Sequence, residues 1–317
     1  MVTGGLPPLR LSIVQILGGS MKFSVPFALA TLAVIMATAQ PVRADDIAAD
    51  LATAQGLYDA QRQDPAVLEQ VIASLNAAVA RADDPAQKYA AFLLLSRSHY
   101  FKGIHLPEAT NDARKQARLQ TFEAGMAACD AANVVSRASF ADQRAECYYF
   151  KAINLGRWGE THGLISFPSI SRRHEYRRSV IDAMNFRRGT DTDDALTGAN
   201  GQPVPRRTGA GRPGVSYEGY GPYRAMGRMY HRLPPGFGKD LARSETMLRD
   251  CVRLGPTVAI NHNYLAEVLW DRGKQDEARD MLRRLLANDE ATFNTDRGPE
   301  THDEFEAARQ LLRGYGG

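Results

Sequence analysis

The chain has 317 residues, 44% hydrophobic and 24% charged, with a formal net charge of +3. This is sufficient for one large domain, or two small ones, with an apolar core. Residues 1–44 contain three of the 39 basic residues and none of the 36 acidic ones, so the rest of the chain is electrically balanced and nucleic acid is excluded as a partner.

The first 44 residues have the layout of a secretory signal. Met21-Lys22 precedes an apolar run from Phe23 to Ala39, and the small residues of Val42-Arg43-Ala44 follow just before Asp45. A charged start, an apolar middle and a small-residue end are typical of a signal peptide, so we expect export and cleavage before Asp45.

Two alternatives concern the same segment. Cleavage after Ala37-Thr38-Ala39 would instead leave Gln40 as the first residue. An uncleaved membrane anchor is disfavoured, because the 17-residue run contains Pro26 and is shorter than the ~20 residues of a typical span. Residues 1–20 precede the natural start of the signal at Met21 and are expected to be an upstream extension.

Residues 45–186 have a helical pattern. Asp64-Pro65, Asp84-Pro85 and Asn111-Asp112 each place a capping residue at an expected helix start. Apolar residues then recur at spacings of three and four, as between Leu68 and Leu75. Since no stretch alternates long enough to be a strand, the sequence predicts an all-α protein.

A different segment spans residues 187–216. It is rich in Gly, Thr, Asp and Pro and has almost no large apolar residue, which predicts a flexible loop. Its Asp191, Asp193 and Asp194 lack the Gly and the later Glu of a calcium-binding EF-hand, so they are expected to be solvated. Residues 217–317 return to the helical pattern.

Four of the expected helices share one arrangement. A large residue precedes a small one, a bulky residue follows three positions later, and in three cases a Gly stands seven positions after the small residue. The small residue permits a close helix contact, and the Gly is expected to end the helix in a left-handed conformation. The four instances are Leu95-Ser96…His99…Gly103, Lys151-Ala152…Leu155…Gly159, Met226-Gly227…Tyr230 and Leu265-Ala266…Leu269…Gly273.

The spacing of the last two instances indicates the kind of repeat. Gly227 and Ala266 are 39 residues apart, and the turn 233–238 accounts for about five extra residues. The remaining ~34 residues are the length of a tetratricopeptide repeat. The sequence therefore predicts stacked antiparallel helix hairpins in a TPR-like α-solenoid, with a flexible Gly/Pro-rich loop between the helical parts 45–186 and 217–317.

Three segments carry a narrower resemblance: 148–159 (YYFKAINLGRWG), 218–230 (EGYGPYRAMGRMY) with the following Leu-Pro-Pro turn, and 263–267 (NYLAE). With them, the chain resembles the periplasmic T component of tripartite ATP-independent periplasmic (TRAP) transporters, a helical-repeat family. The resemblance implies a non-catalytic periplasmic protein that binds or docks for a solute transporter. Its implied partners are a periplasmic solute-binding protein or a transporter subunit.

The first helix of each hairpin lines the concave face of such a stack. Mixed arginines and aromatic rings there suit a small organic acid, although a merely solvated face is the alternative. We expect Arg157, Arg224 and Arg228 to converge on its carboxylate, and Arg224 to contribute little to stability. The residues placed on this face by register are Arg97, Tyr100, Tyr149, Arg157, Arg224, Arg228, His231, Asn263, Glu267 and Trp270.

Other chemistry is weakly indicated. The seven histidines and three cysteines have no metal-ligand spacing, and no nucleophile–base pair is recognisable, so we expect no metal, no cofactor and no enzyme activity. Cys129 and Cys147 fall on successive helices and form either a disulfide or two buried thiols. The alternative function is a cell-envelope scaffold whose concave face binds a peptide or a partner helix.

Overall fold

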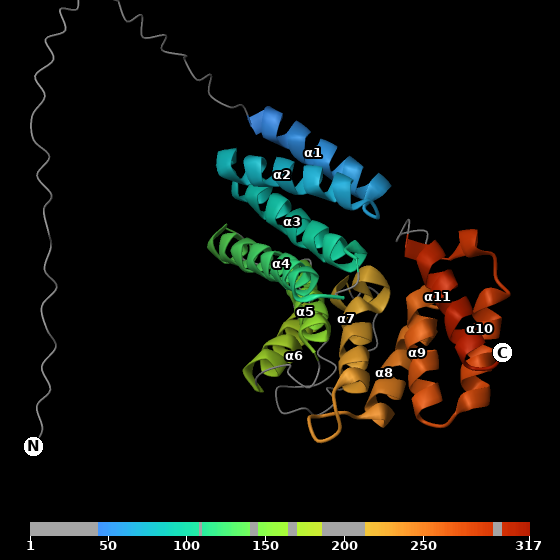
Figure 1. The fold of residues 1–317 in the computed structure, drawn as a ribbon. Coiled ribbons are helices and arrows are strands. Elements are labelled where there is room, and N and C mark those ends of the chain that lie inside the picture. Colours follow the sequence, from blue (N-terminus) through green and yellow to red (C-terminus); the bar gives the residue numbers. More distant parts are fainter. Residues whose placement is uncertain (1–43, 108–109, 140–144, 164–169, 186–212, 294–299) are drawn as a thin grey trace, which may run out of the picture. The chain divides into compact units, whose positions relative to one another are not determined.

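The computed structural model describes residues 44–107, 110–139, 145–163, 170–185, 213–293 and 300–317 (Figure 1). Throughout these ranges the regular structure is helical, which confirms the all-α class, and no helix in them is long and apolar enough to cross a membrane. The expected signal peptide and residues 186–212 lie outside the described residues. The elements are α1 (Ala44–Gln61), α2 (Pro65–Arg81), α3 (Pro85–His105), α4 (Asp112–Ser139), α5 (Ala145–His162), α6 (Ile170–Asn185), α7 (Pro213–Arg232), α8 (Leu241–Leu254), α9 (Ala259–Asp271), α10 (Gln275–Leu286), the 3-10 helix η1 (Glu290–Thr292) and α11 (Glu300–Gly314).

Side-chain caps start three of the early helices, as the sequence predicts. The Asp64 carboxylate accepts a hydrogen bond from the backbone N–H two residues later, at 2.8 Å. The Asp84 carboxylate accepts from the N–H groups two and three residues later, and the Asn111 side-chain oxygen accepts from the N–H of Arg114 at 2.9 Å. Each cap satisfies a helix-terminal N–H that has no partner within the helix.

The helices pack in chain order. Each one contacts the next, from α1 against α2 through to α10 against α11. The odd-numbered helices also contact one another in sequence, α1 with α3, α3 with α5, and so on to α9 with α11. The odd-numbered helices therefore form one layer, and it contains all four helices with the shared small-residue arrangement.

The small residue of each arrangement lies at a helix contact. Ser96, Ala152 and Ala266 have no exposed surface, and Gly227 is buried. A Cβ added to Gly227 would lie 2.8 Å from Cγ of Leu248 on α8. The close approach between α7 and α8 thus depends on the absence of a side chain at this position.

Two glycines expected to end helices lie inside them instead. Gly103 and Gly159 are helical, because α3 and α5 continue to a later histidine in each case. A Cβ at Gly103 would collide with the ring of Phe122 on α4, so this glycine provides room for a neighbouring side chain. Only Gly273 adopts the expected left-handed conformation, with φ +76° after the end of α9.

The helix α7 contains a left-handed turn. Glu218, Gly219 and Tyr220 have φ values of 51°, 59° and 65°, and the main part of the helix follows. Two of these residues have a Cβ and are strained in this region, so other groups must stabilise the turn. The residues 213–216, expected in the flexible loop, are helical here, because Pro213 is favourable at a first helical position.

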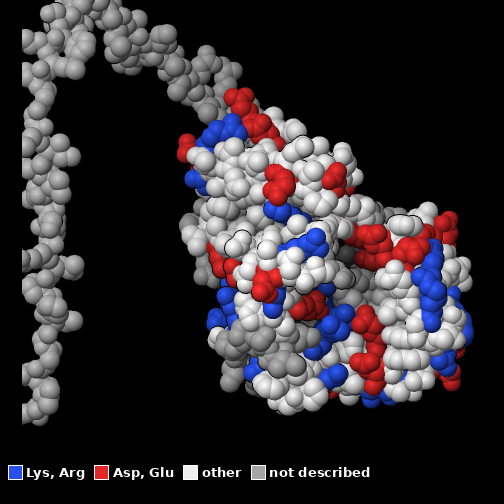
Figure 2. Space-filling model, in the orientation of Figure 1, with Lys and Arg blue, Asp and Glu red and all other residues white. Residues whose placement is uncertain are grey.

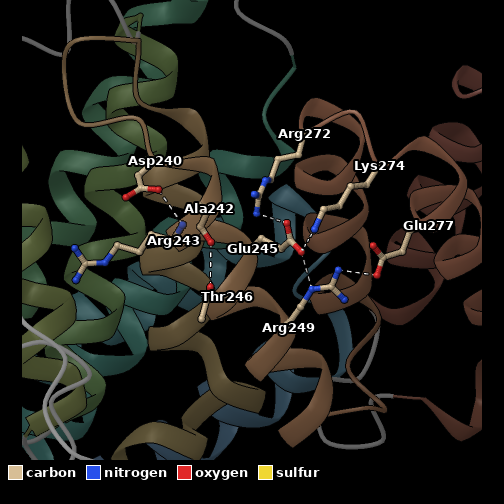
Figure 3. Close-up of polar contacts among 9 residues, drawn as sticks. All are labelled: Asp240, Ala242, Arg243, Glu245, Thr246, Arg249, Arg272, Lys274 and Glu277. Atoms are coloured by element: carbon tan, nitrogen blue, oxygen red, sulfur yellow. Dashed lines mark hydrogen bonds and ion pairs between the residues drawn. The ribbon is translucent and has the colours of Figure 1, made fainter.

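An ion-pair cluster joins the hairpin α7–α8 to the hairpin α9–α10 (Figure 3). The Glu245 carboxylate of α8, only 6% exposed, accepts from Lys274 Nζ at 2.7 Å, Arg249 Nε at 2.8 Å and Arg272. Arg249 also pairs with Glu277 of α10 at 2.6 Å. Because three cations share one shielded carboxylate, this contact is a network rather than an isolated surface ion pair.

The first hairpin also meets the last helix. Arg62, just after α1, donates to both carboxylate oxygens of Glu300 at the start of α11, at 2.5 and 2.7 Å. Both side chains are about nine-tenths buried, and the Arg62 guanidinium lies 5.4 Å from the ring centre of Phe101. Gln63 donates to Asp303 at 3.0 Å beside this pair. The contact joins residues 238 positions apart in the sequence.

Candidate functional site

A cavity of about 120 Å³ lies between odd-numbered helices. The helices α3, α5, α7 and α9 supply most of its wall, and Tyr176 of α6 completes it. Arginines and aromatic rings dominate the lining. Its residues are Arg157, Arg224, Arg228 and Arg232; Glu160 and Glu218; Tyr100, Phe101, Tyr149, Phe150, Tyr176 and Tyr264; and Ile153, Gly156, Ala225, Met229, Leu233 and Ile260.

The helices α5 and α7 run in the same direction. Residues from the earlier part of both helices therefore line one end of the cavity, and residues from their last turns line the other. Near their starts, Arg224 Nη2 donates to the Tyr149 hydroxyl at 3.2 Å. Near their ends, Arg232 Nε lies 3.7 Å from Glu160 Oε1. We call the first the aromatic end (Tyr149, Phe150, Glu218 and Arg224) and the second the basic end (Arg157, Glu160, Arg228 and Arg232).

At the basic end, three guanidiniums surround one carboxylate. Arg157 Nη1 donates to Glu160 Oε2 at 2.9 Å, and Arg232 approaches the other oxygen. Burial acts to raise the pKa of the Glu160 carboxyl, but Arg157, Arg228 and Arg232 outweigh it and hold this pKa below its ordinary value. Glu160 is therefore ionised at neutral pH and already balances one of the three positive charges.

Arg228 has a second carboxylate partner. Its Nη1 donates to Glu267 Oε2 of α9 at 2.6 Å, and its guanidinium lies 4.2 Å from the ring centre of Tyr264. The basic end and its direct partner thus contain three guanidiniums and two carboxylates, Glu160 and Glu267. Among the described residues, one positive charge is left over, in a site partly shielded from water.

At the aromatic end, Arg97 pairs with Glu218 and rings are packed together. Arg97 Nη2 lies 3.5 Å from Glu218 Oε1, and the Arg97 guanidinium covers the Phe150 ring at 5.4 Å from its centre. The Tyr149 ring meets Phe150 and Tyr217 edge to face, with centroids 5.3 and 5.5 Å away. These contacts form a largely apolar wall with one carboxylate in it.

Arg224 has a structural role, which corrects the expectation that it contributes little to stability. It is 4% exposed and donates to the carbonyls of Glu218 and Gly219, each at 3.1 Å. It also donates to Asn261 Oδ1 at 2.9 Å and to the Tyr149 hydroxyl at 3.2 Å. These hydrogen bonds hold the left-handed turn of α7 against the wall and engage the guanidinium with protein oxygens.

Two glycines allow tyrosines to reach the cavity. A Cβ at Gly156 would lie 2.9 Å from the Tyr176 ring, and one at Gly221 would lie 2.6 Å from the Tyr149 ring and hydroxyl. The Tyr176 hydroxyl donates to the carbonyl of Ala225 at 2.9 Å. Glycine is required at both positions by close approach rather than by backbone conformation.

The structure brings together about half of the residues expected on the concave face. Arg97 and Glu267 stand one contact away from the cavity, paired with the lining residues Glu218 and Arg228. The expected residues that line it are Tyr100, Tyr149, Arg157, Arg224 and Arg228.

Three expected residues do not line the cavity. The Asn263 amide donates to the Glu304 carbonyl at 2.7 Å, and the Trp270 ring stacks on Tyr315 with centroids 3.9 Å apart. Both partners belong to α11 or follow it, and α11 covers this face of α9. His231 is 5% exposed and pairs with Asp271 at 2.9 Å. The repeat register does not include α11 and so could not exclude Asn263 and Trp270.

Several residues that line the cavity were not predicted from the sequence. Glu160 follows Arg157 by three positions and Arg232 follows Arg228 by four, so extending each helix face by one turn would have found them. Tyr264 directly precedes the repeat residues of α9. Tyr176 lies on α6, an even-numbered helix, and no pattern in the sequence indicates it.

The cysteines are buried thiols in the structure. The Cys129 thiol donates to Ser96 Oγ at 3.0 Å and neighbours Cys147, and burial raises its pKa well above the ordinary value. The Cys147 thiol donates to the Tyr89 hydroxyl at 3.4 Å. Within the described ranges, no group of three or more His, Cys, Asp or Glu side chains could hold a metal ion.

Chemically, the cavity can hold an anion at its basic end by charge-assisted hydrogen bonds and cover an apolar body along its length. Its described lining contains no Ser, Thr, Cys or His side chain. No protein-family model and no curated protein matches this chain.

Proposed function

We propose that this protein is a non-catalytic binding subunit that holds a small organic anion in the cavity between α5 and α7. The observation that carries the proposal is the basic end, where Arg157, Arg228 and Arg232 pair with two carboxylates of the described residues. A guanidinium in a shielded site binds a carboxylate by short, often bidentate hydrogen bonds. Ligand pockets typically combine a few such groups with apolar walls.

The fold we propose for this role is a TPR-like α-solenoid. The buried small residues in α3, α5, α7 and α9 and the ~34-residue spacing support it. So does the layer of odd-numbered helices that supplies most of the cavity wall. Proteins of this kind bind ligands on the face formed by the first helix of each hairpin.

We further propose that the protein acts in the periplasm beside a TRAP-type transporter, with a solute-binding protein as its partner. The signal-peptide layout supports export. The segments 148–159, 218–230 and 263–267, which carry the resemblance to the TRAP T component, contain most of the lining residues. This coincidence favours a ligand-binding role over the envelope scaffold.

Calorimetric titration of the purified chain with small organic acids tests the anion-binding role. We expect binding by the wild type and weaker binding by Arg232→Gln, whose side chain is 43% exposed and has only a 3.7 Å ion pair to lose. The matched control is Arg283→Gln on α10, where an exposed arginine pairs with Asp280 away from the cavity. If no acid binds the wild type, the anion-binding role is refuted and the scaffold is favoured.

The transporter link is tested separately. Affinity capture from a native envelope extract is expected to recover a TRAP-type solute-binding protein together with the tagged chain. Recovery of other envelope proteins without any transporter component would overturn this link, whether or not an acid binds.

A further inference from the structure

The two ends of the cavity differ in charge and in available hydrogen-bond donors, and this difference restricts the ligand. We infer that the ligand is a monocyclic monocarboxylate, bound with its carboxylate at the basic end and its ring toward the aromatic end. The inference rests on the proposed anion-binding function and specifies the ligand class and its orientation.

The charge balance indicates a single carboxylate. At the basic end, the three guanidiniums exceed Glu160 and Glu267 by one positive charge. One ligand carboxylate neutralises this excess and can accept several charge-assisted hydrogen bonds. A second carboxylate there would leave an uncompensated negative charge in a shielded site.

The aromatic end is unsuited to a second carboxylate. Arg224 lines it, but its guanidinium donates to four protein oxygens, among them two backbone carbonyls of the left-handed turn. The Glu218 carboxylate lies in the same wall, balanced by Arg97. A dianion that spanned the cavity would place its second charge near Glu218, which repels it, and beside Arg224, whose Nη1 and Nη2 donors are already engaged by the protein.

The volume favours a ligand body of about one ring. A cavity of roughly 150 Å³ lined by apolar side chains holds one benzene molecule. The cavity here is of the same order, about 120 Å³, and it opens to solvent, so it can surround one six-membered ring but surrounds a fused bicyclic ring less completely. The apolar residues between the two ends, Ile153 and Met229 among them, would contact that ring.

A ring is preferred to an open chain of similar mass for two reasons. Tyr149 and Phe150 already pack edge to face, and a ligand ring can extend this arrangement. A rigid ring also loses less conformational entropy on binding than an alkyl chain with several rotatable bonds.

Competition calorimetry with a matched series of acids tests this inference. The series is benzoate, cyclohexanecarboxylate, hexanoate, terephthalate and 2-naphthoate, with benzylamine as a cationic control. We expect the first two to bind at least about tenfold more tightly than the others, and benzylamine not to bind. Equal or tighter binding of hexanoate, terephthalate or naphthoate would overturn the ligand class while leaving the anion-binding role in place. Failure of every acid would instead refute the anion-binding role itself.

Variants and a bound structure test the orientation. Arg232→Gln should weaken benzoate binding about tenfold with an unchanged melting temperature, whereas Arg283→Gln should change neither. Glu218→Gln should reduce the preference for benzoate over terephthalate, because it removes the like charge. In crystals with 4-bromobenzoate, the anomalous signal of bromine is expected beside Phe150 and not among the guanidiniums. Bromine at the basic end, or an unchanged benzoate-to-terephthalate ratio in Glu218→Gln, would overturn the orientation.

Discussion

At the scale of single residues, the arginines of the cavity differ in whether their guanidinium groups remain accessible to a ligand. Arg224 is buried and donates to neutral backbone oxygens, and these hydrogen bonds stabilise the strained turn of α7. Arg228 and Arg232 pair with carboxylates and keep exposed surface, at 19% and 43% of their side chains. The same side-chain type therefore stabilises the wall in one place and remains accessible in another, depending on burial and partner.

The first prediction concerns Arg224. Arg224→Ala should lower the free energy of unfolding by about 2–4 kcal/mol, because it removes four buried hydrogen bonds, two of them to the carbonyls of the turn. Arg224→Lys should restore little, since one ammonium cannot reach four acceptors. Urea denaturation of both variants provides the measurement, with Arg283→Ala as an exposed control expected to change by less than about 0.5 kcal/mol. Unfolding of Arg224→Ala at the wild-type urea concentration would contradict the structural role.

The second prediction concerns His99. Burial, and next the nearby Lys102, lower the pKa of His99 to about 4, although Glu69 opposes this shift. The unfolded chain therefore takes up a proton near its ordinary pKa of about 6.5, before the folded chain does. Stability contributed by neutral His99 is present above this pH and is lost as the pH falls toward 4. Between about pH 7 and about pH 5 the loss should amount to about 2 kcal/mol.

Denaturation at several pH values checks this expectation. His99→Gln should show a smaller decrease in stability over this range than the wild type. Part of the decrease should remain, because burial also lowers the pKa of His105, His231 and His262. Identical pH dependence in the variant and the wild type would show that His99 does not titrate differently on folding.

At the scale of helices, the hairpins depend on positions where one helix approaches another. Gly227 of α7 allows Leu248 of α8 to pack within contact distance, and Ser244 Oγ donates to the Gly227 carbonyl at 2.7 Å. In the next hairpin, Ala266 is fully buried. A small residue at these positions sets the distance between the two helices, and a larger one must displace a side chain or the backbone.

The third prediction compares two helical glycines. Gly227→Ala should destabilise the protein, and Gly227→Leu should do so by about 1–3 kcal/mol or more, because the core cannot take the added volume. Gly56→Ala in α1 is the matched control, since nothing lies within 4 Å of a Cβ there. It should stabilise by about 0.5–1 kcal/mol through the higher helix propensity of alanine. Thermal melts of the two alanine variants should shift in opposite directions, and equal shifts would show that Gly227 is not a close contact.

At the scale of the whole molecule, the first hairpin and α11 are joined by the buried pair of Arg62 and Glu300. Acidic side chains gather around the start of α11 in the space-filling view, while basic and acidic side chains mix over the rest of this face (Figure 2). Arg62 also packs on Phe101, which lines the cavity. The contact thus links the ends of the helical series next to the candidate site.

The fourth prediction concerns this contact. Arg62→Met or Glu300→Met alone should cost about 3–5 kcal/mol, because each leaves a buried charge without its partner. The double variant should lose much less than the sum of the two, and the difference measures the coupling. The pair Arg283 and Asp280, exposed on α10, is the control cycle and should couple by about 0.5 kcal/mol or less. Additive losses in the Arg62 cycle would show that the pair is not formed.

What the sequence by itself determined is local. The caps at Asp64, Asp84 and Asn111 and the three-to-four spacing of apolar residues depend on neighbours along the chain, so they predicted the helices correctly. The small positions such as Gly227 also followed from helical spacing. The glycine ends were wrong at Gly103 and Gly159, which lie inside helices, and at Gly103 the missing side chain makes room for Phe122.

Only the tertiary structure decided which expected site residues share a cavity. Tyr149, Arg157 and Arg228 meet there because α5 and α7 run side by side, whereas Asn263 and Trp270 are covered by α11, a helix outside the repeat register. Apart from Glu160, which follows Arg157 by three positions, the carboxylate partners of the arginines at the site were equally invisible, since they lie up to 121 residues away, as in Arg97 with Glu218. Helical periodicity specifies which face of a helix is buried. The charge that remains available at that face depends on which distant helix covers it, and this is a property of the folded chain.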